Sequence, residues 1–226
     1  MPVTYRSQSG SDPSHLIVFL EGAQQTRREE KITPTLTKYG DMLMVDYLNG
    51  RFDAADIVRQ ICNELASLVY PQVTFIGTSL GGLLAHDIIQ EMGRRKKGQK
   101  FQLILLDAPT GAVDLRNKKA HLTRFVPQIW TPKWVNRLPF LYRLGQVRYI
   151  VRHPGPQKTV LGDVPMVFIR SSANTIIERN TPANWGAATD RDVLVITAQT
   201  AFQADLLEFP AAWARCITVA LNILNN

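Results

Sequence analysis

The segment Gln72–Gly82, which reads QVTFIGTSLGG, joins a short apolar run to a serine flanked by glycines. Ser79 lies between Gly77 and Gly81, so the spacing matches the pattern G-x-S-x-G. A helical pattern begins directly after it, at Leu80. In a strand–turn–helix setting, such a serine is held in a strained conformation above the carboxyl edge of a sheet, with its hydroxyl exposed. The segment therefore predicts a nucleophile elbow, with a merely tight strand–helix turn as the alternative.

Further short apolar runs lie on both sides of this segment. They are almost continuously apolar rather than alternating, which is typical of strands covered on both faces of a parallel sheet. The expected strands are His15–Leu20, Asp41–Leu48, Gln72–Ile76, Phe101–Leu106, Val164–Ile169 and Asp192–Thr197.

Helical periodicity separates several of these runs. Ala54–Val69 carries apolar residues at three-to-four spacing, and Asp53 is placed to cap its first turn. Leu80–Met92 follows the expected strand directly, and Phe209–Leu224 closes the chain with Pro210 in its first turn, where proline is tolerated. Strands and helices in alternation predict an α/β fold with a doubly wound, mostly parallel sheet.

Residues 110–160 depart from this rhythm. The segment has no buried-strand run, and it is rich in proline and aromatic residues. It also contains ten Lys or Arg residues and one acidic residue, whereas the whole chain has a net charge of +7. We expect a helical cap inserted after the strand at 101–106, over a core made of residues 1–109 and 161–226.

The cap suggests two kinds of partner. An apolar underside would suit a small acyl or ester-type ligand, and a basic exterior would suit an anionic partner or an anionic lipid surface. An ordinary lid with solvated charges is the alternative. Nucleic-acid binding is not expected, because no groove-reading element is recognisable.

Composition excludes several classes of protein. With 226 residues, 45% hydrophobic and 20% charged, the chain is long and apolar enough to bury a core without a disulfide or metal. Cys62 and Cys216 are expected to be buried free thiols in a reducing compartment. No signal peptide or run long enough to span a bilayer is visible, so a cytoplasmic location is expected. No cofactor-binding fingerprint and no metal-ligand spacing appear, so neither a cofactor nor a metal is expected.

The elbow and the runs around it resemble the α/β-hydrolase family, and the resemblance covers most of the chain. It suggests a small serine ester or thioester hydrolase. By this likeness Ser79 would be the nucleophile, and the N–H of Leu80 would be one oxyanion donor. The second donor would come from the loop after the first apolar strand, at Gly22 or Ala23. The family often has His-Gly in that loop, and Glu21 is a departure from it.

The rest of the catalytic triad does not match the family. Gln203 stands where the resemblance places the histidine, and Asn174 stands where it places the acid. Glutamine cannot accept a proton near neutral pH, so it cannot act as the general base that a serine needs.

Other titratable residues are candidates for the missing general base. His15 is expected at the opposite edge of the sheet, and His86 is expected as a packing or surface residue two turns down the helix from Ser79. His121 and His153 lie in the cap, which could fold over the site. Asp107 is on the correct edge but would orient a histidine rather than replace one. Asp205, close to the missing position, would be a weak base.

Three interpretations therefore stay open. The chain is a serine hydrolase with an unconventional base or weak activity, or it is a catalytically inactive binding protein with a hydrolase fold. The third possibility is that Gln203 and Asn174 are introduced substitutions.

Overall fold

One mostly parallel sheet organises the computed structural model, which describes residues 3–22, 28–47, 52–95, 98–115, 140–155, 161–172, 177–199 and 210–226. Within these residues seven strands pair in the order β1-β3-β2-β4-β5-β6-β7. Only the pair β1–β3 is antiparallel. The strands are β1 Thr4–Gln8, β2 His15–Leu20, β3 Asp41–Asp46, β4 Gln72–Thr78, β5 Lys100–Leu106, β6 Met166–Ser171 and β7 Leu194–Ala198.

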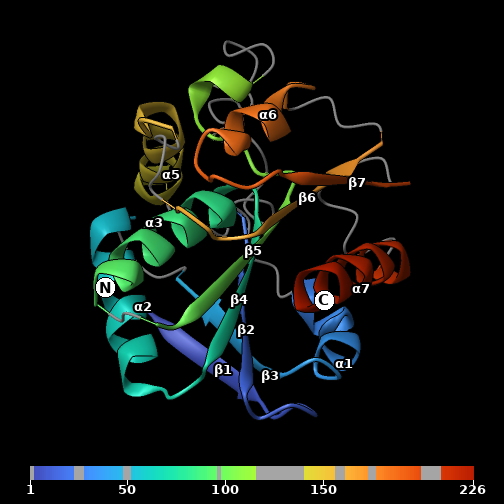
Figure 1. Cartoon of the computed structure of the whole chain (residues 1–226). Helices are drawn as coiled ribbons and strands as arrows, with labels where there is room; N and C mark the ends of the chain where they lie inside the picture. The colour runs from blue at the N-terminus through green and yellow to red at the C-terminus, as the bar shows by residue number, and fades with distance from the viewer. Residues whose placement is uncertain are drawn as a thin grey trace.

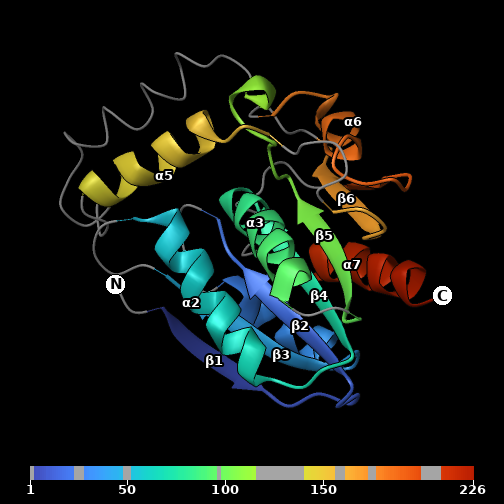
Figure 2. The same cartoon turned by 60° about the vertical axis from the view of Figure 1, so that its left-hand side comes forward.

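Helices cover both faces of this sheet (Figure 1). One face carries α2 and α3, and α5 lies against α3 on the same side of the molecule. The other face carries α1 and α7, and Figure 2 shows α2, α3 and α5 from a second side. The helices are α1 Thr33–Leu36, α2 Ala54–Ser67, α3 Leu80–Arg95, α5 Phe140–Arg152, α6 Thr181–Gly186 and α7 Pro210–Asn225. Two short 3₁₀ turns are η1 Arg28–Lys31 and η2 Ala112–Asp114.

The inner strand β2 shows why its sequence is continuously apolar. Leu16, Val18 and Leu20 belong to the buried cluster under α2 and α3. Ile17 and Phe19 belong to the cluster under α1 and α7. Successive side chains of a strand point to opposite faces, so a strand between two helical layers needs apolar residues at every position.

A chain of buried polar groups joins the starts of three strands to α7. The Nε2 of His15 lies 2.7 Å from the hydroxyl of Thr74, which in turn donates to the Gln102 side chain at 2.6 Å. The Gln102 amide donates to the carbonyl of Leu224 at 2.7 Å. Burial lowers the pKa of His15. His15 therefore has a structural role at the sheet edge opposite Ser79, where the sequence placed it.

The expected fold is confirmed, with shifts of a few residues at the ends of the elements. Two features of the sheet were not anticipated. β1 was missed, because Thr4–Gln8 is a polar, partly exposed edge strand without an apolar run. β7 was expected to be covered on both faces, but Leu194 and Val195 are each 44% exposed, since β7 forms the other edge of the sheet.

The three expected helices also form. Asp53 caps α2 by accepting a hydrogen bond from the backbone N–H of Asp56 at 3.2 Å. α3 continues to Arg95, slightly beyond its predicted end, and α7 begins at Pro210. The single-turn α1 and the short α6 were not predicted, because neither carries a helical pattern in the sequence.

The predicted cap is only partly described. Of residues 110–160, the structure describes 110–115 and 140–155, which contain η2 and α5 but no strand. Residues 116–139 and 156–160 lie outside the described part, so the division into core and cap stays a prediction. Cys62 and Cys216 are both free thiols, but Cys216 is only partly buried. None of the helices in the described ranges is long and apolar enough to cross a membrane.

Candidate functional site

Ser79 sits between the last residue of β4, Thr78, and the first residue of α3, Leu80. Its φ is +52°, in the left-handed region that a side chain other than glycine's disfavours. Its N–H donates to the carbonyl of Leu106 at the end of β5, at 3.0 Å, and its residue surface is partly exposed. Ser79 therefore has the strained backbone that its G-x-S-x-G setting predicts.

The glycines around Ser79 are required by close backbone packing. A Cβ on Gly77 would lie 2.6 Å from the Cα of Gly82, and one on Gly82 would lie 2.4 Å from the Cβ of Ala108. A Cβ on Gly81 would lie 2.1 Å from the carbonyl oxygen of Leu20. These distances are too short for real Cβ contacts. Glycine at the three positions therefore lets α3 start this close to β4, to the end of β2 and to the chain after β5.

The loop after β2 approaches the serine directly. A Cβ on Gly22 would lie 3.2 Å from the Cβ of Ser79 and 3.1 Å from the carbonyl oxygen of Thr78. After β2 the chain passes to β3 on one side of the sheet, and after β4 it passes to β5 on the other side. Such a point in an open α/β sheet forms a crevice at the carboxyl ends of the strands, where ligands bind. Ala23, the other predicted donor residue, lies outside the described residues.

A tyrosine that the sequence analysis did not select fixes this loop. Tyr47, just after β3, is fully buried and donates its phenol hydrogen bond to the backbone carbonyl of Glu21. That carbonyl belongs to the residue before Gly22. In the sequence Tyr47 lies inside the apolar run at 41–48, where it resembles any other core residue. No local pattern therefore indicates its contact with the loop after β2.

Asp107 lies at the carboxyl edge, one strand away from Ser79, as expected. It is fully buried with a φ of +45°. Its carboxylate accepts hydrogen bonds from the backbone N–H of Ser171, at 3.0 Å, and from the Ser171 hydroxyl. Asp107 thus ties the ends of β5 and β6 together.

The two described histidines nearest the elbow in the fold do not contact Ser79. His86 Nδ1 lies 2.9 Å from an oxygen of Asp87, and His153 Nε2 lies 3.2 Å from the same oxygen. Asp87 is eight residues beyond Ser79 on α3, about 12 Å along the axis at 1.5 Å per residue. His86 is buried on α3, and the structure places His153 beside it rather than at the serine.

Three residues with predicted or weighed roles near the serine lie outside the described residues. These are Gln203 at the expected histidine position, Asn174 at the expected acid position, and Asp205. The same holds for His121. The composition of the triad therefore stays a prediction from the sequence.

Solved structures similar to this chain include a thioesterase, an esterase and a lactonase. The type II thioesterase BorB from the borrelidin biosynthetic cluster is 18% identical, with a TM-score of 0.74 over 96% of each chain. A marine microorganism esterase is 15% identical, with a TM-score of 0.72 over 97% of this chain and 98% of that chain. The enol-lactonase from Burkholderia xenovorans LB400 is 11% identical, with a TM-score of 0.75 over 97% and 96%.

These likenesses and the sheet order together establish the fold: this chain has the α/β-hydrolase fold. No family model matches the sequence, and no curated protein matches it closely. Within that fold, Ser79 occupies the strand-to-helix turn of the elbow motif, with the loop after β2 beside it.

Two glycines of the same helix should respond oppositely to alanine. Gly81→Ala should lower the free energy of unfolding by at least about 2 kcal/mol, because the new Cβ meets the rigid carbonyl of Leu20. Gly93→Ala places its Cβ in open space and should raise that free energy by up to about 1 kcal/mol through helix propensity. Urea unfolding followed by circular dichroism measures both, and equal effects at the two positions would contradict the packing described for the elbow.

Proposed function

We propose that this protein is a serine hydrolase of carboxylic esters or thioesters, with Ser79 as the nucleophile and with weak or unconventional activity. The observation that carries the proposal is the left-handed backbone of Ser79 at the start of α3, with Gly22 in contact distance. Strain of this kind costs about 1–3 kcal/mol and is found where a side chain must be presented to a ligand.

The chemistry follows from the positions of the backbone donors. The Ser79 oxygen attacks the acyl carbon, its proton passes to water or to an unconventional base, and the carbonyl oxygen becomes an oxyanion. The N–H of Leu80, at the start of α3, and an N–H of the loop at Gly22 or Ala23 are the proposed donors to that oxyanion. Free N–H groups at a helix start favour developing negative charge. The alcohol or thiol then leaves with a proton, and water releases the acid from the acyl-serine.

The proposed weakness is in proton transfer. Gln203, at the position expected for the histidine, has no side-chain atom that accepts a proton near neutral pH. Loss of one triad member typically leaves a rate about 10³–10⁴ above that in water, supplied by the oxyanion donors and by binding. The alternative, a hydrolase-fold binding protein without catalysis, is favoured by the same residue and by Asn174.

The ligand class is proposed from the same arrangement. The similar solved structures include a thioesterase, an esterase and a lactonase, whose names all refer to acyl groups on sulfur or oxygen. We place a small acyl or ester-type ligand at the carboxyl edge between β2 and β4. The basic segment 110–160 would face an anionic partner or an anionic lipid surface, and the protein would act in the cytoplasm.

Removal of the serine hydroxyl tests the proposal. Wild-type protein should label slowly with a fluorophosphonate probe and hydrolyse a short chromogenic thioester above the background rate. Ser79→Ala should abolish both signals. Ser67→Ala, a change at an exposed serine near the end of α2, should leave both unchanged. Labelling that persists in Ser79→Ala would show that a residue other than Ser79 is the nucleophile. A wild-type protein indistinguishable from background would favour the binding-protein alternative.

Restoring a base should raise the rate. Gln203→His is expected to increase turnover of the chromogenic ester at least about tenfold, because an imidazole can take the serine proton. Asn174→Asp should add more in the Gln203→His background than it does alone, since a carboxylate stabilises the imidazolium and sets its tautomer. Steady-state kinetics of the two single variants and the double variant measure this coupling. High turnover by the wild-type enzyme, unchanged in Gln203→Ala and lowered in His121→Ala, would instead place the general base in the cap.

Tyr47 should affect turnover through the loop that it holds. Tyr47→Phe removes the phenol that bonds the Glu21 carbonyl and should lower kcat about three- to tenfold, with a smaller change in KM, because one oxyanion donor is less well positioned. Tyr70→Phe is the matched control, since Tyr70 donates to Asp41 at 2.7 Å, at the start of β3 and the far edge of the sheet. Equal losses of kcat in the two variants would show a general effect on stability instead.

A further inference from the structure

A cluster of three metal-ligating side chains lies two turns down α3 from the elbow. His86 and Asp87 are neighbours on α3, and His153 follows the last residue of α5. His86 Nδ1 lies 2.9 Å and His153 Nε2 lies 3.2 Å from the same oxygen of Asp87, and the three atoms lie within 4.8 Å of one another. The two imidazole side chains are 4% exposed, and the Asp87 side chain is 28% exposed.

Asp87 is held as an anion in this cluster. Burial alone would raise its pKa, but the hydrogen bonds from His153, His86 and Tyr149 outweigh burial and hold the pKa well below its usual range. The Tyr149 hydroxyl donates to the second carboxylate oxygen at 2.6 Å. Burial and the charge of Asp87 raise the pKa of Tyr149, so the phenol stays a donor. Tyr149 thus orients the carboxylate and leaves the first oxygen facing the two histidines.

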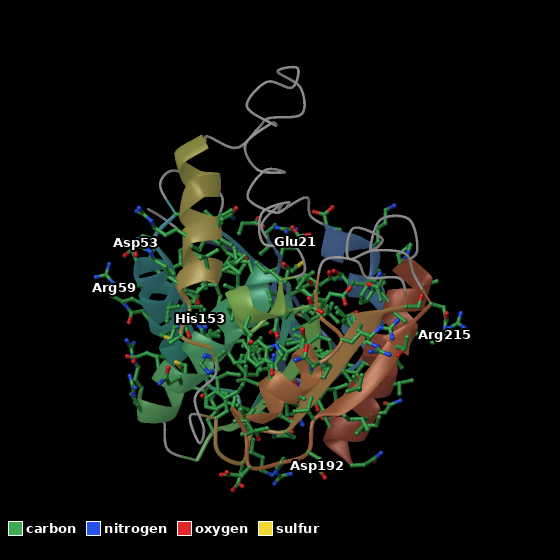
Figure 3. The ribbon with its side chains drawn as sticks, turned by 90° about the horizontal axis from the view of Figure 1, so that it is seen from above. Glu21, Asp53, Arg59, His153, Asp192 and Arg215 are labelled. Atoms are coloured by element: carbon green, nitrogen blue, oxygen red, sulfur yellow. The ribbon has the colours of Figure 1, made fainter. Side chains whose placement is uncertain are left out.

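The cluster faces a cavity. A cavity of about 1350 Å³ lies between α2, α3 and α5, and His86, Asp87, Tyr149 and His153 are among its lining residues, whereas Ser79 is not. Figure 3 shows His153 beside α5, on the same side as Asp53 and Arg59 of α2 and well apart from Glu21. An ion or a water molecule could therefore reach the cluster without passing the serine.

We propose that His86, Asp87 and His153 form a zinc site that fastens the α5 segment to α3. Two imidazole nitrogens and one carboxylate oxygen are ligands that favour Zn²⁺ over Ca²⁺ or Mg²⁺. Tetrahedral bonds of about 2.0–2.2 Å set neighbouring ligand atoms about 3.3 Å apart. The separations of 2.9 and 3.2 Å from the Asp87 oxygen are already close to that value, and the two nitrogens have to approach each other by side-chain rotations. The fourth ligand is water from the cavity.

Zinc binding requires each imidazole proton to move to the other ring nitrogen. Without metal, both ring nitrogens that face Asp87 carry a proton and donate to it; His153 Nδ1 accepts from the N–H of Gly155 at 3.2 Å. With metal, each neutral ring carries its proton on its other nitrogen instead. In His86 this is Nε2, a buried atom without a hydrogen-bond partner among the described residues. In His153 it is Nδ1, so the contact from Gly155 has to open.

The site is structural rather than catalytic. Its ligands lie about 10–12 Å along α3 from Ser79, too far for the ion to touch a reacting acyl group. Asp87 already links the helices through Tyr149 and His153, and the ion would replace hydrogen bonds with stronger metal–ligand bonds. His153 stands 66 residues from Asp87 in the sequence, so the ligands come together only in the folded chain. Zinc would therefore bind the folded state in preference to the unfolded one and stabilise it by mass action.

Zinc titration of the full chain, without an affinity tag and after treatment with a chelator, tests the proposal. At neutral pH the protein should withdraw one equivalent of Zn²⁺ from a chromophoric chelator, with a micromolar or lower dissociation constant. Tm should rise with zinc concentration. Co²⁺ in place of zinc should give the intense visible bands of a tetrahedral site.

Variants separate this site from adventitious binding. Asp87→Asn and His153→Gln should each weaken zinc binding by at least about 100-fold, and Tyr149→Phe, which keeps all three ligands, by about tenfold. Glu91→Gln is the matched control, since Glu91 lines the same cavity but pairs with Arg95 at 2.8 Å. Absence of zinc binding and of cobalt bands in the wild-type protein overturns the proposal, whether or not a variant folds. So does undiminished binding in both ligand variants.

Discussion

The close approach of α3 to β2 at Gly81 is the contact on which the rest of the site depends. A helix that starts this near a neighbouring strand's carbonyl has no room for a side chain at the contact. The approach forces the chain to turn within one residue after β4, and that residue is Ser79. It also brings Gly22 against the serine, because Gly22 follows the strand that α3 touches. Glycine packing, rather than any polar interaction, therefore sets the geometry of the elbow.

Two carboxylates, the fully buried Asp107 and the partly buried Asp87 on α3, each accept several hydrogen bonds. Asp107 accepts hydrogen bonds from the backbone N–H and the hydroxyl of Ser171. Asp87 accepts hydrogen bonds from two histidines and Tyr149. A carboxylate that accepts several hydrogen bonds is stabilised as an anion and is a poor proton acceptor. In the parts of the chain that the structure describes, both acids serve to join elements, β5 to β6 and α3 to α5.

The sequence predicted the fold well because the two strongest signals are local. Continuous apolar runs located β2 to β7, and the glycine pattern located Ser79. The predictions for the two edge strands were incomplete for physical reasons. β1 lies at a polar edge, where side chains need not be apolar. Leu194 and Val195 of β7 are apolar but partly exposed, so the sequence alone does not distinguish them from core residues. Sequence reasoning also could not see contacts that only tertiary structure creates. Tyr47 reaches the loop after β2 from another strand, and His153 reaches Asp87 across 66 residues of sequence.

The left-handed residues at the ends of β4 and β5 imply a trade-off between stability and function. Glycine would occupy φ values of +52° and +45° without a steric penalty, so serine and aspartate at these positions each cost folding free energy. The aspartate offsets its cost through the bonds that it accepts from Ser171. The serine side chain shows no comparable bond within the described ranges. Its presence destabilises the native state, a cost that stability alone gives no reason to keep.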